Sequence, residues 1–338
     1  MGGPGAGRYA PSPTGELHIG NLRTAVLAWL FARSSSRELL LRIEDLDTGR
    51  VRPGVARRQI ADLAALGITF DGVPVVQSER TSAYAVAVSS LAERTFECFC
   101  TRRDIADAAS APHDQLASVR SADAPGVITG SGAVLEYRRY PGTCRNLTAA
   151  QRAERRAVRA PALRLRAEQA TMTITDELHG RLTGPVDDIV LRRNDGGYAY
   201  NLAVVIDDAA SGIDQVVRGD DLLGSAISQA YLGTLLGGPA PTYAHVPLAL
   251  NRQGRRLAKR DGAVTLTDLA AQGIGPTAVL GAIAVSLELA SPGEPVTLPL
   301  LLERFAVQRL PREPWIVDPS AAGRASRSAD GGRGELGC

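Results

Sequence analysis

The first structured segment of the chain begins with Arg8-Tyr-Ala-Pro-Ser-Pro-Thr-Gly-Glu-Leu-His-Ile-Gly-Asn21. Its prolines favour an extended turn, and Gly15 and Gly20 let the backbone approach a ligand closely. Apolar residues at helical spacing follow, which predicts an amphipathic helix over residues 18–33. The free N–H groups at the start of such a helix suit an anion such as phosphate. His18 stands at this helix start, where a lone histidine is more often a cap than a catalyst.

Beyond this segment, strand patterns and helix patterns alternate. Leu39–Ile43 is a short apolar run typical of a buried strand, and residues 54–66 repeat a helical pattern. Further along we predict strands over Ala199–Ile206 and Ile213–Arg218, and a helix over Gly224–Leu236. This alternation predicts an α/β fold with a parallel sheet.

The composition of the 338 residues limits the classes of function. A net charge of +2 excludes a polycation held to nucleic acid by bulk charge, although a local basic face stays possible. No run is apolar and long enough to span a membrane, and the Gly-rich start has no apolar signal core. We therefore expect a cytoplasmic protein in a reducing environment. There, its four cysteines are more often metal ligands or free thiols than disulfides.

Lysine is almost absent from the chain. Of the 38 basic residues only Lys259 is a lysine, and it lies in the basic segment Asn251–Arg260. Lysine is a compact point charge, whereas arginine is a planar fork, so the two are not equivalent at a phosphate. Residue chemistry alone leaves a phosphate role and chance survival on a solvated loop equally open.

Several segments resemble class I aminoacyl-tRNA synthetases, specifically the glutamyl and glutaminyl branch. Arg8–Asn21 resembles their His-Ile-Gly-His motif, and Arg256–Arg260 resembles their Lys-Met-Ser-Lys-Ser motif. The other segments that resemble this branch are Leu41–Asp47, Tyr200–Ala203 and Val217–Asp221. The similarity covers about residues 8–262 in the expected order. Asn21 departs from the pattern where the family has a second histidine, and Ala258 departs where it has a serine.

The resemblance implies an enzyme that binds ATP, Mg²⁺ and an acidic amino acid. His18 and Lys259 would be the catalytic residues. The ATP site it implies comprises His18, Gly20, Asn21 and Lys259. The glutamate site it implies comprises Arg8, Ala10, Ser12, Glu44, Tyr200 and Arg218, where arginines pair with carboxylates and Glu44 holds the α-ammonium group. Without the resemblance, Glu44-Asp45-Leu46-Asp47 suits a metal site or a solvated strand end equally, and we expect Asp207–Asp208 to form a turn.

Three cysteines form a candidate zinc site. Cys98, Cys100 and Cys144 lie within one region, and three thiolates suit a tetrahedral structural zinc ion. On chemistry alone His113 is the preferred fourth ligand, because tyrosine is an uncommon one. The resemblance to glutamyl-queuosine tRNA(Asp) synthetases, which carry a C-x-C…Y-x-x-x-C site, implies Tyr140 instead. Three unrelated buried thiols remain the alternative.

The same resemblance implies a reaction. Such enzymes activate L-glutamate with ATP without tRNA, then transfer it to queuosine in the anticodon loop of tRNA(Asp). We expect a monomer with one structural Zn²⁺ ion and no membrane association. The alternatives are a truncated glutamyl-tRNA synthetase that charges a tRNA 3′ end, and a non-catalytic RNA-binding paralogue. The arginines of residues 152–166 suit RNA phosphates, but a solvated helix face explains them equally.

The expected fold is a class I synthetase Rossmann-type parallel α/β sheet. It would carry an inserted zinc-containing, acceptor-binding-like subdomain and a short helical C-terminal region without an anticodon-binding domain. The predicted parts are a disordered N-terminus (1–7), the first half of the catalytic domain (8–97), the inserted zinc-binding and RNA-contacting subdomain (98–195), the second half of the catalytic domain with the lysine motif (196–262), the helical C-terminal region (263–317) and a disordered tail (318–338).

Overall fold

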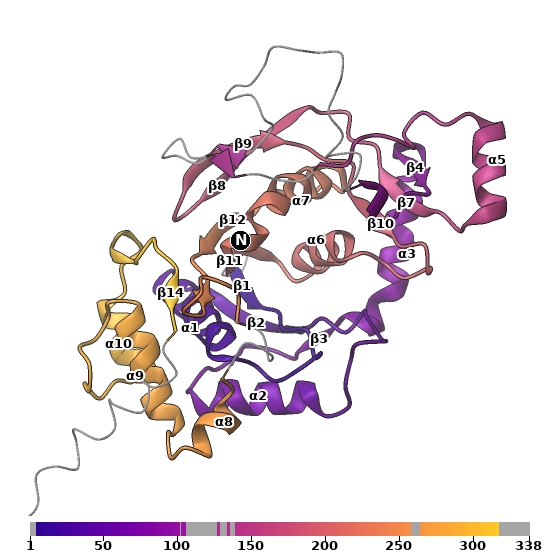
Figure 1. Cartoon of the computed structure of the whole chain (residues 1–338). Coiled ribbons are helices and arrows are strands. Elements are labelled where there is room, and N and C mark those ends of the chain that lie inside the picture. The colour runs from indigo at the N-terminus through magenta and orange to yellow at the C-terminus, as the bar shows by residue number, and fades with distance from the viewer. Residues whose placement is uncertain are drawn as a thin grey trace, which may run out of the picture. The chain divides into compact units, whose positions relative to one another are not determined.

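The computed structural model of the protein describes residues 5–101, 103–105, 127–128, 134–135, 139–257 and 264–317. The chain forms two compact units. Unit 1 consists of Met1–Val75, Gln215–Asp221 and Ala244–Cys338, and unit 2 consists of Val76–Asp214 and Leu222–Tyr243. Figure 1 shows the helices and strands that make up both units. Of the helices among the described residues, none has the length and apolar character that crossing a bilayer would demand.

A mainly parallel sheet forms the centre of unit 1. In it β1 (Ala6–Tyr9) lies between β2 (Glu38–Ile43) and β11 (Ile213–Gly219), and β12 (Thr242–Val246) follows β11. β1 and β2 run parallel, with Tyr9 opposite Leu41. All four residues of β1 are buried. A run buried in this way is typical of a strand that is covered on both faces.

The helices of unit 1 surround a helix that is buried on nearly all sides. Eleven residues of α1 (Ile19–Ser34) are buried, and it packs against β1, β2 and α10 (Leu298–Arg304). Phe31 of α1 meets Phe305 edge to face, with 5.1 Å between ring centroids. A helix that is apolar all round belongs in a core. The remaining elements are α2 (Val55–Ala65), α8 (Leu266–Ala270), α9 (Pro276–Ser286), η5 (Val307–Arg309), β13 (Ala249–Leu250) and β14 (Trp315–Ile316).

Among its described residues, unit 2 combines two groups of strands with several helices. The first group is an antiparallel sheet in which β7 (Ala162–Leu165) lies between β4 (Thr95–Cys98) and β10 (Val190–Arg192). In the second group β8 (Thr171–Asp176) pairs with β9 (Gly180–Pro185), and Asp176 also pairs with Tyr243 of β12. The other elements are β5 (Val127–Ile128), β6 (Val134–Leu135), η1 (Gln77–Arg80), α3 (Thr81–Ser90), η2 (Ala92–Arg94), α5 (Ala149–Val158), α6 (Tyr200–Ala210) and α7 (Leu223–Leu235). In sequence, four elements cross the unit boundaries: β3 (Val75–Val76), β11, η3 (Asp220–Leu222) and β12.

The prediction of a strand over Ala199–Ile206 and a turn at Asp207–Asp208 is wrong, because both lie in helix α6. A short apolar run fits a buried strand and a buried helix equally well, so periodicity alone does not separate them. The carboxylate of Asp207 is fully buried and accepts hydrogen bonds from Gln77 Nε2 and Tyr84 Oη, each at 2.8 Å. These partners from η1 and α3 stabilise a buried acid within the helix.

The other elements predicted from local pattern are confirmed, with ends shifted by at most one residue. They are the strands at Leu39–Ile43 and Ile213–Arg218 and the helices at 18–33, 54–66 and Gly224–Leu236.

Two terminal predictions need correction. β1 begins at Ala6, so residues 1–7 are not disordered throughout: Ala6 and Gly7 pair with β2. Within residues 264–317, the described part of the predicted helical C-terminal region, the helices α8, α9, α10 and η5 are accompanied by the strand β14. The predicted tail, residues 318–338, lies outside the described residues.

Candidate functional site

His18 caps the first helix of unit 1. Its Nδ1 accepts a hydrogen bond from the Asn21 N–H at 3.3 Å, and the Asn21 side-chain oxygen accepts one from the His18 N–H at 3.1 Å. This reciprocal pair is a capping box. Burial lowers the pKa of His18. Because Nδ1 accepts, the proton of the neutral ring lies on Nε2. Asn21 thus closes the cap at the position where the motif it resembles has a second histidine.

Gly20 has no room for a side chain. A Cβ atom there would lie 3.0 Å from the Ala249 Cβ and 3.1 Å from the Cε1 and Nδ1 atoms of His18. Contacts this short would displace the imidazole ring. The glycine therefore fixes the distance between the start of α1, the capping histidine and β13.

The loop between β1 and α1 is held from two sides. Gln59, which is 1% exposed, donates from Nε2 to the carbonyl oxygens of Ser12 at 3.1 Å and Gly15 at 2.7 Å. The Ile19 N–H donates to the carbonyl of Val264 at 3.0 Å. The chain that follows the lysine motif is therefore attached to the start of α1. Ala258 and Lys259 themselves lie outside the described residues.

Two of the predicted glutamate-binding arginines lie on adjacent strands. Arg8 of β1 and Arg218 of β11 are each 5% exposed. Nη1 of Arg8 donates to the Val217 carbonyl at 3.2 Å, and Nε of Arg218 donates to Nε2 of His245 at 3.0 Å. His245 is fully buried. Sequence reasoning missed His245, because a single histidine inside an apolar strand carries no motif.

The other predicted glutamate-binding residues divide between the units. Ala10 and Ser12 follow β1, and Glu44 follows β2 and pairs with Arg42 at 3.1 Å. Ligands of open α/β sheets bind outside the carboxyl ends of the strands, where these residues lie. Tyr200 belongs to unit 2, where it begins α6 and is 39% exposed.

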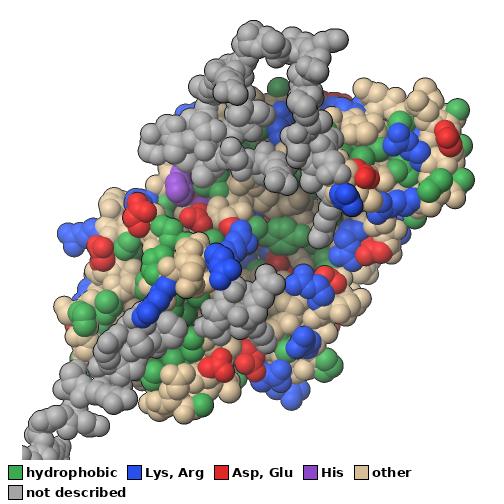
Figure 2. Space-filling view, viewed as in Figure 1, with side chains coloured by type: hydrophobic (Ala, Val, Ile, Leu, Met, Phe, Trp, Pro, Cys, Tyr) green, Lys and Arg blue, Asp and Glu red, His purple; other side chains and the backbone are tan. Residues whose placement is uncertain are grey.

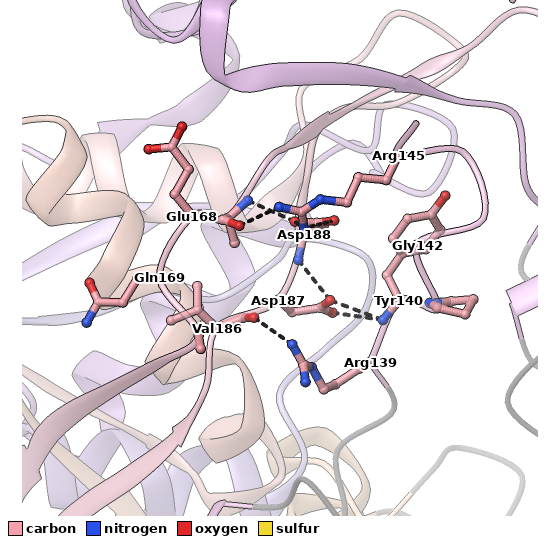
Figure 3. Close-up of a pocket in the computed structure, with 12 residues that line it drawn as sticks. Arg139, Tyr140, Gly142, Arg145, Glu168, Gln169, Val186, Asp187 and Asp188 are labelled. Carbon is pink, nitrogen blue, oxygen red and sulfur yellow. Dashed lines mark hydrogen bonds and ion pairs between the residues drawn. The ribbon is translucent and has the colours of Figure 1, made fainter. Parts of the chain in front are cut away.

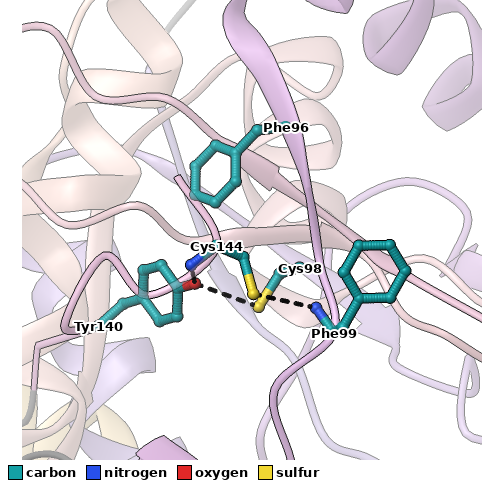
Figure 4. Packing of buried hydrophobic residues seen from close by; sticks show 5 residues of the cluster. All are labelled: Phe96, Cys98, Phe99, Tyr140 and Cys144. Carbon is teal, nitrogen blue, oxygen red and sulfur yellow. Dashed lines mark hydrogen bonds between the residues drawn. The ribbon is translucent and has the colours of Figure 1, made fainter. Parts of the chain in front are cut away.

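The predicted metal ligands of unit 2 converge on one point. The sulfur atoms of Cys98, Cys100 and Cys144 all lie within 4.8 Å of one another, and those of Cys100 and Cys144 are 3.6 Å apart. Zn–S bonds of about 2.3 Å in a tetrahedron place sulfur atoms about 3.8 Å apart. Tyr140 Oη lies 3.5 Å from the Cys98 sulfur (Figure 4). It lies 3.9 Å from the Cys100 sulfur. His113 lies outside the described residues.

Charge in this cluster depends on the neighbours of each thiol. Burial, with Cys98 and Cys144 close by, raises the pKa of Cys100 to about 12, and burial also raises the pKa of Tyr140. The pKa of Cys144 is lowered: burial would raise it, but the Phe99 N–H, the Tyr140 hydroxyl and Arg155 favour the thiolate. A divalent cation binds such groups by replacing their protons. The donor set therefore fits a zinc ion.

A buried acidic pair supports the loop that carries Tyr140 and Cys144. The carboxylate oxygens of Asp187 accept from the Tyr140 N–H at 3.1 and 3.3 Å, and Asp188 forms an ion pair with Arg145 at 2.7 Å. Figure 3 shows these contacts around a cavity of about 510 Å³. Burial raises the pKa of Asp187. Partners of this kind orient the ligands of metal sites.

The arginines of α5 are engaged within unit 2. Arg155 donates to the Cys144 sulfur at 3.6 Å, Arg152 donates to the Leu147 carbonyl at 2.7 Å, and Arg156 pairs with Glu97 at 2.8 Å. Basic and acidic side chains are intermixed on the face drawn in Figure 2. Contact of these arginines with RNA phosphates stays a prediction.

Comparisons with known proteins agree with the fold. The family model for the catalytic domain of class I tRNA synthetases (E and Q) matches residues 6–286. A crystal structure of glutamate-tRNA synthetase from Elizabethkingia anophelis superposes with a TM-score of 0.74 at 23% identity, covering 97% of this chain and 70% of that chain. The glutamate tRNA ligase of Elizabethkingia meningosepticum gives 0.72 at 24% identity, covering 96% and 69%.

Curated relatives of higher sequence identity indicate the subgroup of this family to which the chain belongs. It is 58% identical over 316 residues to the glutamyl-Q tRNA(Asp) synthetase of Nocardia farcinica, covering 93% of each chain. It is 48% identical over 292 residues to the protein of that name from Cutibacterium acnes, covering 86% of this chain and 78% of the relative. The predicted family, fold class and assignment as an enzyme are thereby confirmed. The chain belongs to the class I tRNA synthetases of the E and Q type, and among these ligases to the glutamyl-Q tRNA(Asp) synthetases.

Proposed function

We propose that the protein activates L-glutamate with ATP in the absence of tRNA, and then transfers the glutamyl group to queuosine in the anticodon loop of tRNA(Asp). The relatives that carry this substrate in their name are up to 58% identical to it. The observation that carries the proposal is the pair of buried arginines, Arg8 and Arg218, on adjacent strands beside the capped start of α1. Two fixed guanidinium groups suit the carboxylates of an acidic amino acid.

In the first step a glutamate carboxylate oxygen attacks the α-phosphorus of ATP. The bond from that phosphorus to the bridging oxygen breaks, so that glutamyl-adenylate forms and pyrophosphate leaves. This step needs no protein nucleophile, because positioning and charge stabilisation lower its barrier. Arg8 and Arg218 would bind glutamate, with Ala10, Ser12 and Tyr200 completing its pocket and Glu44 holding the ammonium group.

The start of α1 would hold the phosphates. The capping box directs the proton of His18 to Nε2, so that this nitrogen can donate to a phosphate oxygen. Gly20 would present its backbone N–H at the positive end of the helix dipole, and Asn21, whose N–H closes the cap of His18, would act through that cap. Lys259 would neutralise charge on the β- and γ-phosphates. Bound Mg²⁺ would supply further positive charge at the pyrophosphate.

In the second step a hydroxyl group of queuosine attacks the carbonyl carbon of the adenylate. An ester forms, AMP leaves with the bonding electron pair, and the hydroxyl proton passes to solvent. Cys98, Cys100, Tyr140 and Cys144 would hold one zinc ion that cross-links unit 2 and takes no part in the chemistry. We further propose that the protein acts as a monomer.

Glutamate-dependent exchange of pyrophosphate into ATP, measured without tRNA, tests the first step. The second step is tested by charging queuosine-containing tRNA(Asp) and tRNA(Glu) in parallel. We expect exchange without tRNA and esterification of tRNA(Asp) alone. Absence of exchange would refute the proposed activation, and efficient charging of tRNA(Glu) would favour a truncated glutamyl-tRNA synthetase.

The role of Lys259 has its own test. Lys259→Arg keeps the positive charge but replaces a compact ammonium group with a planar guanidinium group. We therefore expect the variant to lose most of the exchange activity. Arg309→Lys, at an exposed position, is the matched control and should keep full activity. Equal activity of the two variants would remove Lys259 from the ATP site.

A further inference from the structure

A fully buried histidine lies beside one of the two arginines. His245 of β12 and Arg218 of β11 occupy neighbouring strands of the sheet (Figure 1). They are 0% and 5% exposed, and Nε of Arg218 donates to Nε2 of His245 at 3.0 Å. Buried polar groups are stable only with such partners. The contact therefore couples the orientation of the guanidinium group to that of the imidazole ring.

This contact determines the protonation state of His245. Arginine has donors and no acceptor, so Nε2 of the imidazole must act as the acceptor. The ring must then be neutral and carry its single proton on Nδ1. Moving the proton to Nε2 would remove the acceptor, and a second proton there would in addition place an imidazolium cation against Arg218 inside the core. The tautomer is the reverse of that of His18, whose Nδ1 accepts from Asn21.

The two arginines are held by different means. Arg8 donates through Nη1 to a backbone carbonyl, that of Val217, which no substitution removes. Arg218 donates through Nε to a side chain, which can be replaced. A guanidinium group can pair bidentately with a carboxylate through its two terminal amino groups or through Nε and one of them, so a partner on Nε leaves the two terminal amino groups for the carboxylate. A partner on Nε restricts rotation of the fork.

We propose that His245 is a positioning residue that orients the Arg218 fork for a carboxylate of glutamate and so sets the affinity for the amino acid. This inference rests on the proposed function, because that function makes Arg218 a glutamate ligand. His245 contributes to binding of the amino acid and leaves ATP affinity unchanged, since its partner is the arginine and not the phosphate site at His18. A neutral acceptor at the Nε2 position is its essential property.

The test compares three variants in tRNA-independent exchange. His245→Leu removes the acceptor, His245→Gln supplies a carbonyl oxygen at a similar reach, and Val246→Ala removes buried volume from the next position of β12 without touching Arg218. We expect His245→Leu to raise the KM for glutamate by about tenfold or more, because a hydrogen bond to a charged group contributes about 1.5–3 kcal/mol. The KM for ATP should change by less than about twofold.

His245→Gln should recover most of the lost affinity, and Val246→Ala should lower thermal stability without a selective effect on glutamate. A second measurement needs no catalysis. In the ¹⁵N spectrum of the imidazole groups, of which the chain has four, the signals that His245→Gln removes should be those of a neutral ring with an unprotonated Nε2.

The outcomes separate this inference from the proposed function. Absence of exchange in the unsubstituted protein overturns the function, while the spectrum still tests the state of His245. If the unsubstituted protein catalyses exchange but His245→Leu and Val246→Ala have equal KM values for glutamate, the inference about His245 is overturned and the proposed function stands. A protonated Nε2 in the spectrum overturns it as well.

Discussion

The carboxyl edge of the sheet in unit 1 and the thiol cluster of unit 2 bury polar groups in opposite ways. In unit 1 each key group meets a complementary one: Asn21 closes the cap of His18, and His245 accepts from Arg218. In the cluster of unit 2, three thiol groups lie around one point, and burial together with the neighbouring thiols raises the pKa of Cys100 to about 12. The first site is ordered by contacts within the polypeptide, whereas the donor set of the second fits a cation such as zinc.

The largest effect is expected from removing one thiol of the cluster. Cys98→Ala should abolish stoichiometric zinc binding and lower the free energy of unfolding by about 3 kcal/mol or more, because structural zinc contributes directly to folding. Metal content by mass spectrometry and thermal unfolding measure both changes. Cys338→Ala, which removes the remaining cysteine of the chain, is the control and should change neither. Equal zinc content in the two variants would show that the cluster is three packed thiols.

Tyr140→Phe tests the fourth ligand at a smaller expected cost. It removes the oxygen that faces the Cys98 sulfur and accepts the Cys144 N–H at 2.7 Å, while the ring stays in place. We expect zinc affinity, measured by competition with a chelator, to fall by about 10–100-fold. Tyr198→Phe removes a hydroxyl elsewhere in unit 2 and should keep the original affinity. Unchanged affinity in Tyr140→Phe would exclude the phenol as a ligand.

Gly20→Ala tests how tightly unit 1 is ordered. The added Cβ would lie 3.0 Å from Ala249 and 3.1 Å from the His18 ring, so the free energy of unfolding should fall by about 1–3 kcal/mol. Gly281→Ala in α9 is the matched control, because no atom lies within 4 Å of its added Cβ. That variant should gain up to about 1 kcal/mol, since alanine favours a helix. Denaturant unfolding measures the free energy of unfolding of both variants. A similar change in Gly20→Ala and Gly281→Ala would contradict the prediction.

The smallest effect concerns pH and the cap of α1. Burial lowers the pKa of His18 below its ordinary value of 6.5, so the unfolded chain binds a proton more readily than the folded one. Stability from His18 is therefore complete above about pH 6.5 and is lost as the pH falls below it. His18→Asn keeps a cap that does not titrate. Between about pH 7.5 and about pH 5.5 the unsubstituted protein should lose up to about 1 kcal/mol more than this variant. Identical losses would contradict the assignment.

Local pattern predicted the fold where a segment has one plausible environment. The run Leu39–Ile43 is apolar and short, and it is the buried strand β2. Residue type also predicted that Cys98, Cys100 and Cys144 form one cluster, whereas Tyr140 in place of His113 was implied only by the family resemblance. In β2 the residues that decide the structure are neighbours in the chain. In the cluster Cys98 and Tyr140 are 42 residues apart, and residue type together with the resemblance linked them.

Prediction failed where the deciding contacts come from distant segments. Asp207 lies in a helix and not in a turn because Gln77, Arg80 and Tyr84, more than a hundred residues earlier, satisfy its carboxylate. His245 has no motif around it, and only the pairing of β11 with β12 reveals its partner. Long-range contacts of single polar residues leave no periodic signal in one sequence.

The hydrogen bonds of Asp207 also restrict how far helix α6 can rotate about its own axis. Tyr200 begins α6 and Asp207 follows seven residues later, so the two side chains leave the helix from nearly the same side, about 10 Å apart along its axis. Gln77, Arg80 and Tyr84 donate hydrogen bonds to the Asp207 carboxylate. Because they come from outside α6, these bonds oppose rotation of the helix about its own axis. For an atom that lies about 6 Å from that axis, a rotation of about 10° produces a displacement of about 1 Å. Misplacement on that scale can cost an enzyme about a hundredfold in rate. The buried carboxylate therefore restrains rotation of the helix that begins with Tyr200.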